Sequence, residues 1–582
     1  MFIRPCYRRK NGKRHAYWML VECVRTEKGP RQRVVGYIGG LPEKPRRRVK
    51  LAADGHRADE QGRLFREASE AAEWVDVDTS RMRLENRRDF GGPWLSLQLV
   101  KMLGLDNFLA ASLPRGKESV SWDLTALILV LCRLLNPSSE LHIAEHFYRS
   151  TALPDILGVQ PAQVDDNRLY RGLDVLLEQK EALEVFLKNR LGTLFSLEYD
   201  ILFYDITSTY FEGGMAGCPI AKRGYSRDSR PDCKQVVIAL VVSRCGMPLG
   251  YEVFDGNKSD STSVEEMVGL IEKRYGRSDR IWVMDRGMVT EANLEFMRRE
   301  GRRYIVGTPK SLLSRHEAAL LREDWTNVRE GMEVKRLDAD VPGETFILCR
   351  SQDRSQKEQA MRELFSKRME AGLAKLAARC EKRKCAPSKI SESLGRLRER
   401  NSRASRFYYV KVHDDSGRAR LEWRVETDKQ ERASPLDGCY ILRSNIQDWK
   451  PEDLWEAYIH LTEAEAAFRI HKSDLRLRPV WHQKEGRVRA HILVCFLAYV
   501  LWKTLGRLCA RAGLGDEPRR VLKELSSIDL VDVILPTKGG PELRRSCVTV
   551  PTPHQRILLD KLEMKLPIQW SKLDVFSENA NL

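Results

Sequence analysis

A series of short β-rich segments between residues 201 and 306 constrains the fold most, because each is too short to be a buried helix. A turn at Gly246-Met247-Pro248 joins two of the first three segments, and helix-like segments separate the later ones. The predicted strands lie at 201–204, 236–242, 249–254, 280–284 and 304–306, and the predicted helices at 263–274 and 291–299. Strands in hairpin order that then alternate with helices indicate an α/β fold with a mixed sheet.

The net charge indicates the kind of partner. Lys and Arg number 99 against 82 Asp and Glu, a surplus of +17 that favours a polyanion, with nucleic acid the first candidate and an anionic membrane the second.

The longest apolar stretches, 124–135 and 492–502, fall short of the roughly 20 residues of a membrane span, so we expect buried helices and no membrane partner. The N-terminus lacks the apolar core of a secretory signal, and the 13 Cys form no Cys-x-x-Cys pair, which indicates a cytoplasmic protein with reduced thiols and no zinc signature.

Much of the positive charge lies at the N-terminus, where the first 50 residues hold 15 Lys or Arg against three Glu. Residues 16–24 and 32–38 have the pattern of a β-hairpin. A charge run of this kind is either a solvated tail or a surface for DNA phosphates, and the interleaved aromatic residues favour the second. The candidate phosphate contacts are Arg8, Arg9, Lys10 and Arg14.

Two acids follow apolar strands directly. Asp205 comes after 201–204 and Asp285 after 281–284, where the ends of strands in α/β sheets commonly form a ligand crevice. Each acid alone has a plain alternative, because Asp is a common turn residue and helix N-cap. Because both acids follow an apolar strand in the same way, a shared functional role is favoured over the turn or N-cap alternative.

Glu465 is the candidate third acid. In a continuous helix, positions seven apart lie about two turns apart on one face, which aligns Tyr458, Glu465 and Lys472. A carboxylate between a phenol and an ammonium suits a metal ion beside a phosphate chain. The rival acid Glu463 lacks such a frame, and a solvated helix face is the alternative for both.

At this point the chain resembles a known family. The pattern Tyr-x2-Arg-x3-Glu-x6-Lys marks the last acid in one large group of bacterial insertion-sequence transposases of the Asp-Asp-Glu (DDE) type. Here Leu461 replaces the Arg, and Arg469 is the candidate to take over its DNA contact. The sequences around Asp205 and Asp285 and the turn 256–260 also resemble that family, over roughly residues 200–500.

The resemblance implies a ribonuclease-H-like core with an insertion between the second Asp and the Glu, and Asp205, Asp285 and Glu465 as catalytic metal ligands. It also implies two Mg²⁺ ions, with Mn²⁺ as a possible substitute, which agrees with the preference of these hard ions for oxygen ligands. Water would cut at the element's ends, and the freed 3′-hydroxyl would then attack target DNA. The implied partners are DNA, as terminal inverted repeats and target, and a second copy of the chain, in a homodimer on DNA in the bacterial cytoplasm, associated with the nucleoid when bound.

A chain of 582 residues is too long for one core, so we expect several regions. They are a basic DNA-contacting hairpin at 1–50, a linker at 51–92, a helical DNA-binding region at 93–197, the core at 198–310 and 446–515, an inserted α+β region at 311–445, and a tail at 516–582.

Other positions and functions stay open. Asp260 and Glu212 could assist Asp205, and Trp481 with His482 could contact displaced bases, although Trp481 is equally expected in the core. The alternative function is a non-catalytic, sequence-specific DNA-binding protein derived from a transposase. A ribonuclease-H-like repair or RNA nuclease shares the chemistry but not the Tyr-Glu-Lys frame.

Overall fold

The computed structural model of the chain describes two compact units, one made of 83–534 with 544–574 and one of 1–82 with 535–543 and 575–582. The described residues are 2–10, 13–26, 29–39, 56–58, 64–66, 76–320, 322–337, 341–382, 385–537, 542–567, 570 and 574–576, and up to residue 66 little beyond the backbone is described.

The smaller unit contains an antiparallel sheet of three strands, β1 (Phe2–Lys10), β2 (Lys13–Thr26) and β3 (Gly29–Gly39). The predicted hairpin is therefore confirmed, with β1 as an additional strand. The register places Arg9 opposite Arg14 and Lys10 opposite Lys13. Short strands β4 (His56–Ala58) and β5 (Leu64–Arg66) also pair.

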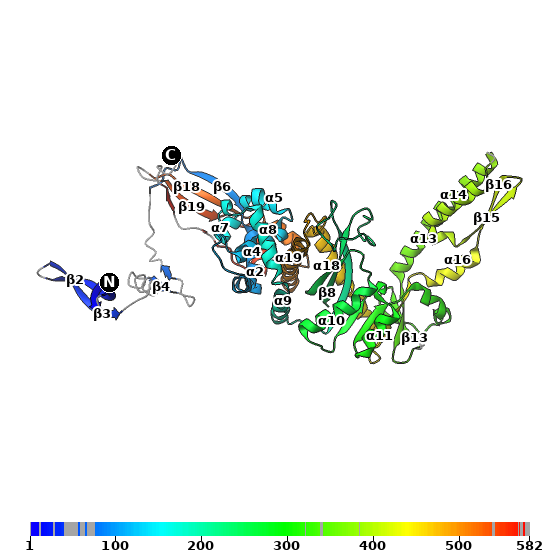
Figure 1. Ribbon diagram of the computed structural model, residues 1–582, viewed down its shortest axis with the longest axis horizontal. Coiled ribbons are helices and arrows are strands. Elements are labelled where there is room, and N and C mark those ends of the chain that lie inside the picture. The colour runs from blue at the N-terminus through cyan, green and yellow to red at the C-terminus, as the bar shows by residue number, and fades with distance from the viewer. Residues whose placement is uncertain are drawn as a thin grey trace. The chain divides into compact units, whose positions relative to one another are not determined.

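The larger unit begins with the predicted helical region (Figure 1). Its main helices are α2 (Gly91–Leu103), α3 (Leu105–Ser112), α4 (Trp122–Leu135), α7 (Leu153–Leu157), α8 (Asp166–Leu177) and α9 (Lys180–Phe195), with the short α5 (Glu140–His142), a π-turn at Ile143–Phe147 and α6 (Tyr148–Ser150) between α4 and α7. The apolar spacing that predicts these helices also gives them buried faces.

A nine-stranded mixed sheet forms the core, in the order β12-β13-β14-β17-β11-β10-β7-β8-β9. Its first strands along the chain, β7 (Ile201–Tyr210), β8 (Gln235–Ser243) and β9 (Pro248–Asp255), are antiparallel neighbours. β10 (Ile281–Met284) and β11 (Arg303–Gly307) then add in parallel on the other side of β7. This arrangement confirms the mixed α/β sheet predicted from the sequence, and it is the ribonuclease-H-like core that the family resemblance implies.

Helices cover both faces of the sheet. Successive side chains of a strand point to opposite faces, and apolar side chains of β7 on each face are buried under helices. Leu202, Tyr204 and Ile206 of β7 pack with α10 (Val264–Tyr275) and α11 (Glu291–Arg299), whereas Ile201 and Phe203 point into the opposite core. That opposite core also contains α18 (Thr462–Arg469) and α19 (Glu485–Arg511). Asp205 lies two residues beyond Phe203, so it is on the α18 face.

α19 alone is long and apolar enough, among the described residues, to be a candidate membrane span by itself, but 89% of its apolar window is buried inside the protein. It packs against α4 and α8. α4 is buried as well. Both segments are therefore core helices of this unit.

The expected insertion at 311–445 is only partly separate from the core. β12 (Thr326–Arg329), β13 (Met332–Leu337), β14 (Thr345–Ser351) and β17 (Cys439–Ser444) extend the main sheet, because β17 pairs with β11. Only the segment between β14 and β17 projects from the sheet, with its own apolar cluster (Figure 1). It consists of α13 (Gln352–Lys382), α14 (Pro387–Arg400), α15 (Ser402–Ser405), β15 (Tyr408–Asp415), β16 (Arg418–Val425) and α16 (Thr427–Ala433).

The expected linker and tail also differ from expectation, because they pair with each other. β6 (Arg83–Asp89) is antiparallel to β18 (Asp529–Leu535), which neighbours β19 (Glu542–Val548). The fully buried Asp532 of β18 accepts hydrogen bonds from Arg88 and Ser546. α20 (Pro518–Leu525) and α21 (Pro553–Lys561) pack together nearby. Pairing between segments about 440 residues apart leaves no local sequence pattern.

Candidate catalytic site

The register of two parallel strands brings Asp205 and Asp285 together. Met284, the last residue of β10, is the register partner of Tyr204 of β7, so the residues that follow them, Asp285 and Asp205, lie at the same level. Asp285 follows the end of β10 as expected. Asp205 does not follow a strand end, because β7 continues to Tyr210 along its pairing with β8.

Glu465 lies on α18, which packs against β7 and β8. Tyr458 and Lys472 are not on that helix. α17 (Pro451–Ile459) ends after Tyr458, and α18 is followed by a π-turn at Ile470–Asp474 that contains Lys472. The continuous helix assumed for the Tyr-Glu-Lys frame is therefore wrong, because the chain breaks at His460-Leu461 and widens after Arg469.

Burial and neighbouring negative charges disfavour the ionisation of Asp205 and of Glu465. Burial first, and then the negative charges of Asp285 and Glu465, raise the pKa of Asp205 to about 7, against the opposing hydrogen bond from the Ile206 amide. Burial and the charge of Asp285 raise the pKa of Glu465 as well. Bound cations would relieve this repulsion.

A cavity of about 310 Å³ opens beside the acids, lined by Asp285, Glu465 and Tyr458. The cations on its wall are Arg286, Lys310 and Arg354. Burial, together with the charge of Asp285, raises the pKa of Tyr458, so its hydroxyl stays protonated and can donate a hydrogen bond.

Leu461, which replaces the expected Arg, also lines the cavity and is 6% exposed. It fills core space instead of contacting a phosphate. Arg469 is exposed on α18, and among the described residues it forms no ion pair.

Lys472 is bound to an acid that sequence reasoning missed. Its Nζ lies 2.7 Å from Oδ1 of Asp228, and Arg478 donates to the same oxygen. The Asp228 side chain is 2% exposed. Burial lowers the pKa of Lys472, while the hydrogen bond and charge of Asp228 oppose that shift. Asp228 lies in the β7–β8 connection among other charged residues, so its sequence carried no signal for this contact.

The remaining acids near the site have other partners. Asp260 is bound by Arg227, whose positive charge also lowers the pKa of Asp205. Glu212 lies 3.3 Å from Arg230. The rival Glu463 pairs with Lys503 of α19 at 3.4 Å. None of the three lines the cavity beside the acids.

The N-terminal candidates Arg8, Arg9 and Lys10 lie on β1, and Arg14 lies on β2. Their side chains are outside the described part of the structure. The backbone register places all four residues at the same end of the β1–β2 hairpin.

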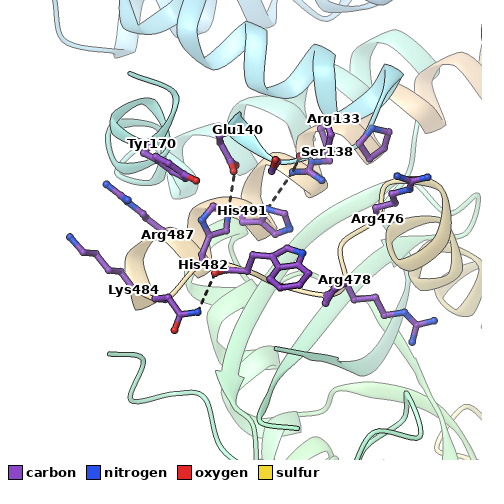
Figure 2. Close-up of a pocket in the computed structure, with 15 residues that line it drawn as sticks. Arg133, Ser138, Glu140, Tyr170, Arg476, Arg478, His482, Lys484, Arg487 and His491 are labelled. Atoms are coloured by element: carbon purple, nitrogen blue, oxygen red, sulfur yellow. Dashed lines mark hydrogen bonds and ion pairs between the residues drawn. The ribbon is translucent and has the colours of Figure 1, made fainter. Parts of the chain in front are cut away.

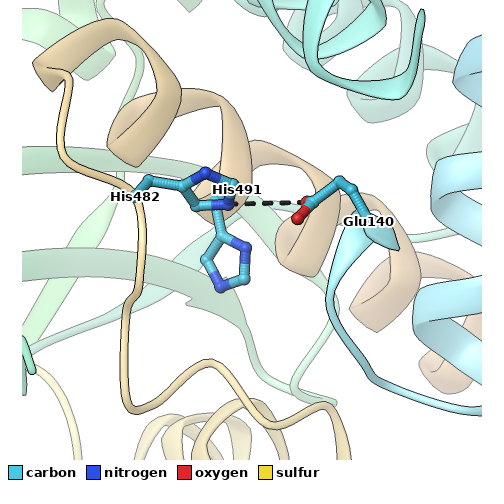
Figure 3. Close-up of side chains that lie close together, drawn as sticks. All are labelled: Glu140, His482 and His491. Carbon is cyan, nitrogen blue, oxygen red and sulfur yellow. Dashed lines mark ion pairs between the residues drawn. The ribbon is translucent and has the colours of Figure 1, made fainter. Parts of the chain in front are cut away.

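A second cluster of possible metal ligands, Glu140, His482 and His491, lies away from these acids (Figure 3). Its donor atoms lie within 4.8 Å of one another and all three residues are buried. However, Arg133 lies 3.5 Å from Nδ1 of His491, and Nε2 of His491 lies 3.3 Å from the Leu477 carbonyl. Both ring nitrogens are engaged and a guanidinium stands beside the group, so it suits a cation poorly.

Comparison with known proteins identifies the family of the chain. No curated protein matches the chain. The solved piggyBac transposase synaptic complex with hairpin DNA has a TM-score of 0.35 and 7% identity, covering 78% of this chain and 82% of that one, a similarity too weak to support an inference. The family model described as "Transposase DDE domain" matches residues 198–501, which include all three acids and more than half of the 582 residues. The chain therefore belongs to the family of transposases that carry a DDE domain.

Proposed function

We propose that the protein is an active transposase that cuts DNA at the ends of its mobile element and joins the freed 3′-hydroxyl to target DNA, with Mg²⁺ as its ion and Mn²⁺ as a substitute. The observation that carries the proposal is the strand register that sets Asp205 beside Asp285, on the face covered by the helix of Glu465. Three acids from separate segments meet there although their charges repel, which a purely structural role does not explain.

The donor set suits hard divalent ions, because Asp205, Asp285 and Glu465 offer carboxylate oxygens only. Among the described residues, their oxygens do not form a group that lies within 4.8 Å throughout. Two ions about 3.5–4 Å apart span a wider set of ligands than one ion does. When bound, such ions supply an activated oxygen nucleophile and stabilise the leaving oxygen.

The chain's own groups position the DNA strand. The protonated Tyr458 hydroxyl can donate to a phosphate oxygen in the cavity. Arg286, Lys310 and Arg354 place positive charge on the same wall, although Lys310 and Arg354 both pair with Glu358, at 2.7 and 3.4 Å. Cations at these places favour a phosphate over water next to the acids.

DNA as the partner is supported by the surplus of +17 and by the facing basic positions on β1 and β2. We expect binding to the terminal inverted repeats and to target DNA. A homodimer on DNA follows from the need to hold two element ends together.

The test compares binding and cutting by Asp205→Asn, Asp285→Asn and Glu465→Gln proteins. The substrate is a labelled duplex made from the DNA that flanks the gene, with Mg²⁺, with Mn²⁺ or with a chelator. Each variant should bind like the wild type but lose cutting by at least about a hundred-fold, since it loses a metal ligand. Glu463→Gln, which changes an acid on the same helix, should keep cutting.

Cutting at the wild-type rate by any of the three variants would refute the assignment of that acid. A wild-type protein that binds the duplex but never cuts it, with either ion, would favour the alternative function of a non-catalytic DNA-binding protein.

A further inference from the structure

A pocket of about 650 Å³ lies where the loop before α19 meets the helical region (Figure 2). Tyr170 of α8, Glu140 of α5 and Arg133 of α4 line one part, and residues 476–484 with α19 line the rest. The pocket is separate from the cavity beside the three acids, since no residue lines both.

Trp481 is 65% exposed on the wall of this pocket, although its neighbours in sequence are fixed. The amide of Val480 donates to the Tyr210 carbonyl at 3.1 Å, and His482 is 9% exposed and pairs with Glu140. An indole held on both sides but left open to solvent is unusual, because large aromatic side chains normally bury their surface. It provides a flat apolar surface for stacking.

Positive charge surrounds the pocket. Arg476 and Arg478 lie on one side, and Lys484 and Arg487 on the other (Figure 2). Among the described residues, neither Arg476 nor Lys484 forms an ion pair. Arg487 lies over the Tyr170 ring at 4.7 Å, and its Nε pairs at 3.5 Å with Asp174, whose side chain is half exposed, so Arg476 and Lys484 are the cations available to a ligand. The pocket is therefore built to hold an anion.

Among the described residues that line the pocket, Glu140 is the one acid, and it is already paired with His482. Burial would raise its pKa, but His482 and the positive charges around it hold that pKa at about 2. The ionised Glu140 carboxylate is paired with His482, so it does not pair with the cations at the mouth of the pocket. Its remaining lone pairs provide an acceptor for an N–H group deep in the pocket.

The pocket is connected to the catalytic acids through β7. Phe211, next to the end of β7, forms a bridge with Val480, so Trp481 is anchored beside the strand that carries Asp205. The six residues of extended chain from Asp205 to Phe211 span about 20 Å, the reach of a few nucleotides. Asp228 adds a second connection, because it holds both Lys472 of the signature and Arg478 of the pocket.

We propose that this pocket binds one unpaired nucleotide of a DNA strand whose neighbouring residues occupy the catalytic site, with its base stacked on Trp481 and its phosphate held by Arg476 and Lys484. The proposal rests on the proposed function for the identity of the ligand as DNA. Stacking on an aromatic side chain with backbone contacts to cations is how proteins hold single-stranded bases.

The test uses the non-cutting Asp205→Asn protein, without divalent ions, and a short single-stranded DNA with one 2-aminopurine. The comparison strands carry an abasic residue at that position or are paired with a complement. The 2-aminopurine fluorescence should be quenched on binding. In the double variant with Asp205→Asn and Trp481→Ala, the quenching should disappear and the single strand should bind about ten-fold more weakly, whereas the affinity for the duplex should not change. Trp481→Phe should restore much of the affinity.

Two comparisons separate the base from the phosphate. Tyr409→Ala, at an exposed aromatic on β15, should change nothing. The abasic strand should bind the parent protein as weakly as the 2-aminopurine strand binds the Trp481→Ala protein. A double Arg476→Gln, Lys484→Gln change should weaken all single strands and reduce the salt dependence of binding by about two ions.

Equal weakening of single strand and duplex by Trp481→Ala, unchanged affinity for both, or undiminished affinity for the abasic strand would overturn the proposal. If the wild type cuts DNA but Trp481→Ala changes neither the quenching nor the affinity for the single strand, only the inference about this pocket fails. If base-dependent binding is found but no cutting occurs, the proposed function fails and the nucleotide pocket stands.

Discussion

The interaction of Asp228 with Lys472 and Arg478 leads to a quantitative prediction. Both cations donate to the same oxygen of a carboxylate that is 2% exposed. Hydrogen bonds to charged groups contribute about 1.5–3 kcal/mol each. Asp228→Ala removes two of them and leaves two cations facing each other, so the free energy of unfolding should fall by about 3–5 kcal/mol. Asp228→Asn keeps an oxygen acceptor and should cost about half as much.

Urea unfolding, followed by circular dichroism and tryptophan fluorescence, measures these changes. The matched control is Asp415→Ala, which removes an Asp from an ion pair with Arg420 that is 58% exposed on the Asp side. That change should cost less than about 1 kcal/mol. Both Asp228 variants should also cut DNA more slowly at temperatures where they remain folded, because Lys472 loses its ion pair in both and its hydrogen-bond acceptor in Asp228→Ala. A loss in Asp228→Ala no larger than in Asp415→Ala would refute the reasoning.

Three further predictions concern stability and the site. His471 is buried, which lowers its pKa to about 4 from 6.5, so its contribution to stability is complete above pH 6.5 and is lost as the pH falls toward 4. The wild type should lose about 2 kcal/mol of unfolding free energy between pH 6.5 and 5 through this residue, and His471→Gln should show a shallower fall; equal pH profiles would contradict this. Gly307 leaves no room for a Cβ beside the Tyr458 hydroxyl, so Gly307→Ala should displace that flexible group and reduce cutting with little change in the unfolding midpoint; normal cutting would contradict the role of Tyr458. Saturating Mg²⁺, at about a hundred times its Kd, should stabilise the wild type by about 2.7 kcal/mol and Asp285→Asn by much less, as measured by thermal unfolding; equal shifts would exclude Asp285 as a ligand.

Local patterns in the sequence were enough to predict most of the core elements. The predicted helices at 263–274 and 291–299 correspond to α10 and α11, and the short apolar run 281–284 forms β10. Such elements depend on periodicity and turn residues within a few positions. The basic hairpin was predictable for the same reason, although its first strand was not.

Pairing between distant segments was beyond local patterns. The region 311–445 was predicted as an inserted α+β region, but only the structure shows that its strands β14 and β17 extend the core sheet. Nothing in the sequence linked β6 to β18. Backbone hydrogen bonds carry no residue code, so register and partner are decided by the packing of the whole sheet.

The sequence by itself determined which three acids to consider, because Asp205 and Asp285 follow apolar runs and Glu465 has a recognisable frame. Tertiary structure decided how they meet. The β7–β10 register aligns the two Asp residues, and a break in the helix separates Tyr458 from Glu465. Tertiary structure also placed Lys472 against Asp228, a residue 244 positions away. That contact depends on how the β7–β8 loop and the π-turn after α18 lie in space, and no spacing along the chain encodes it.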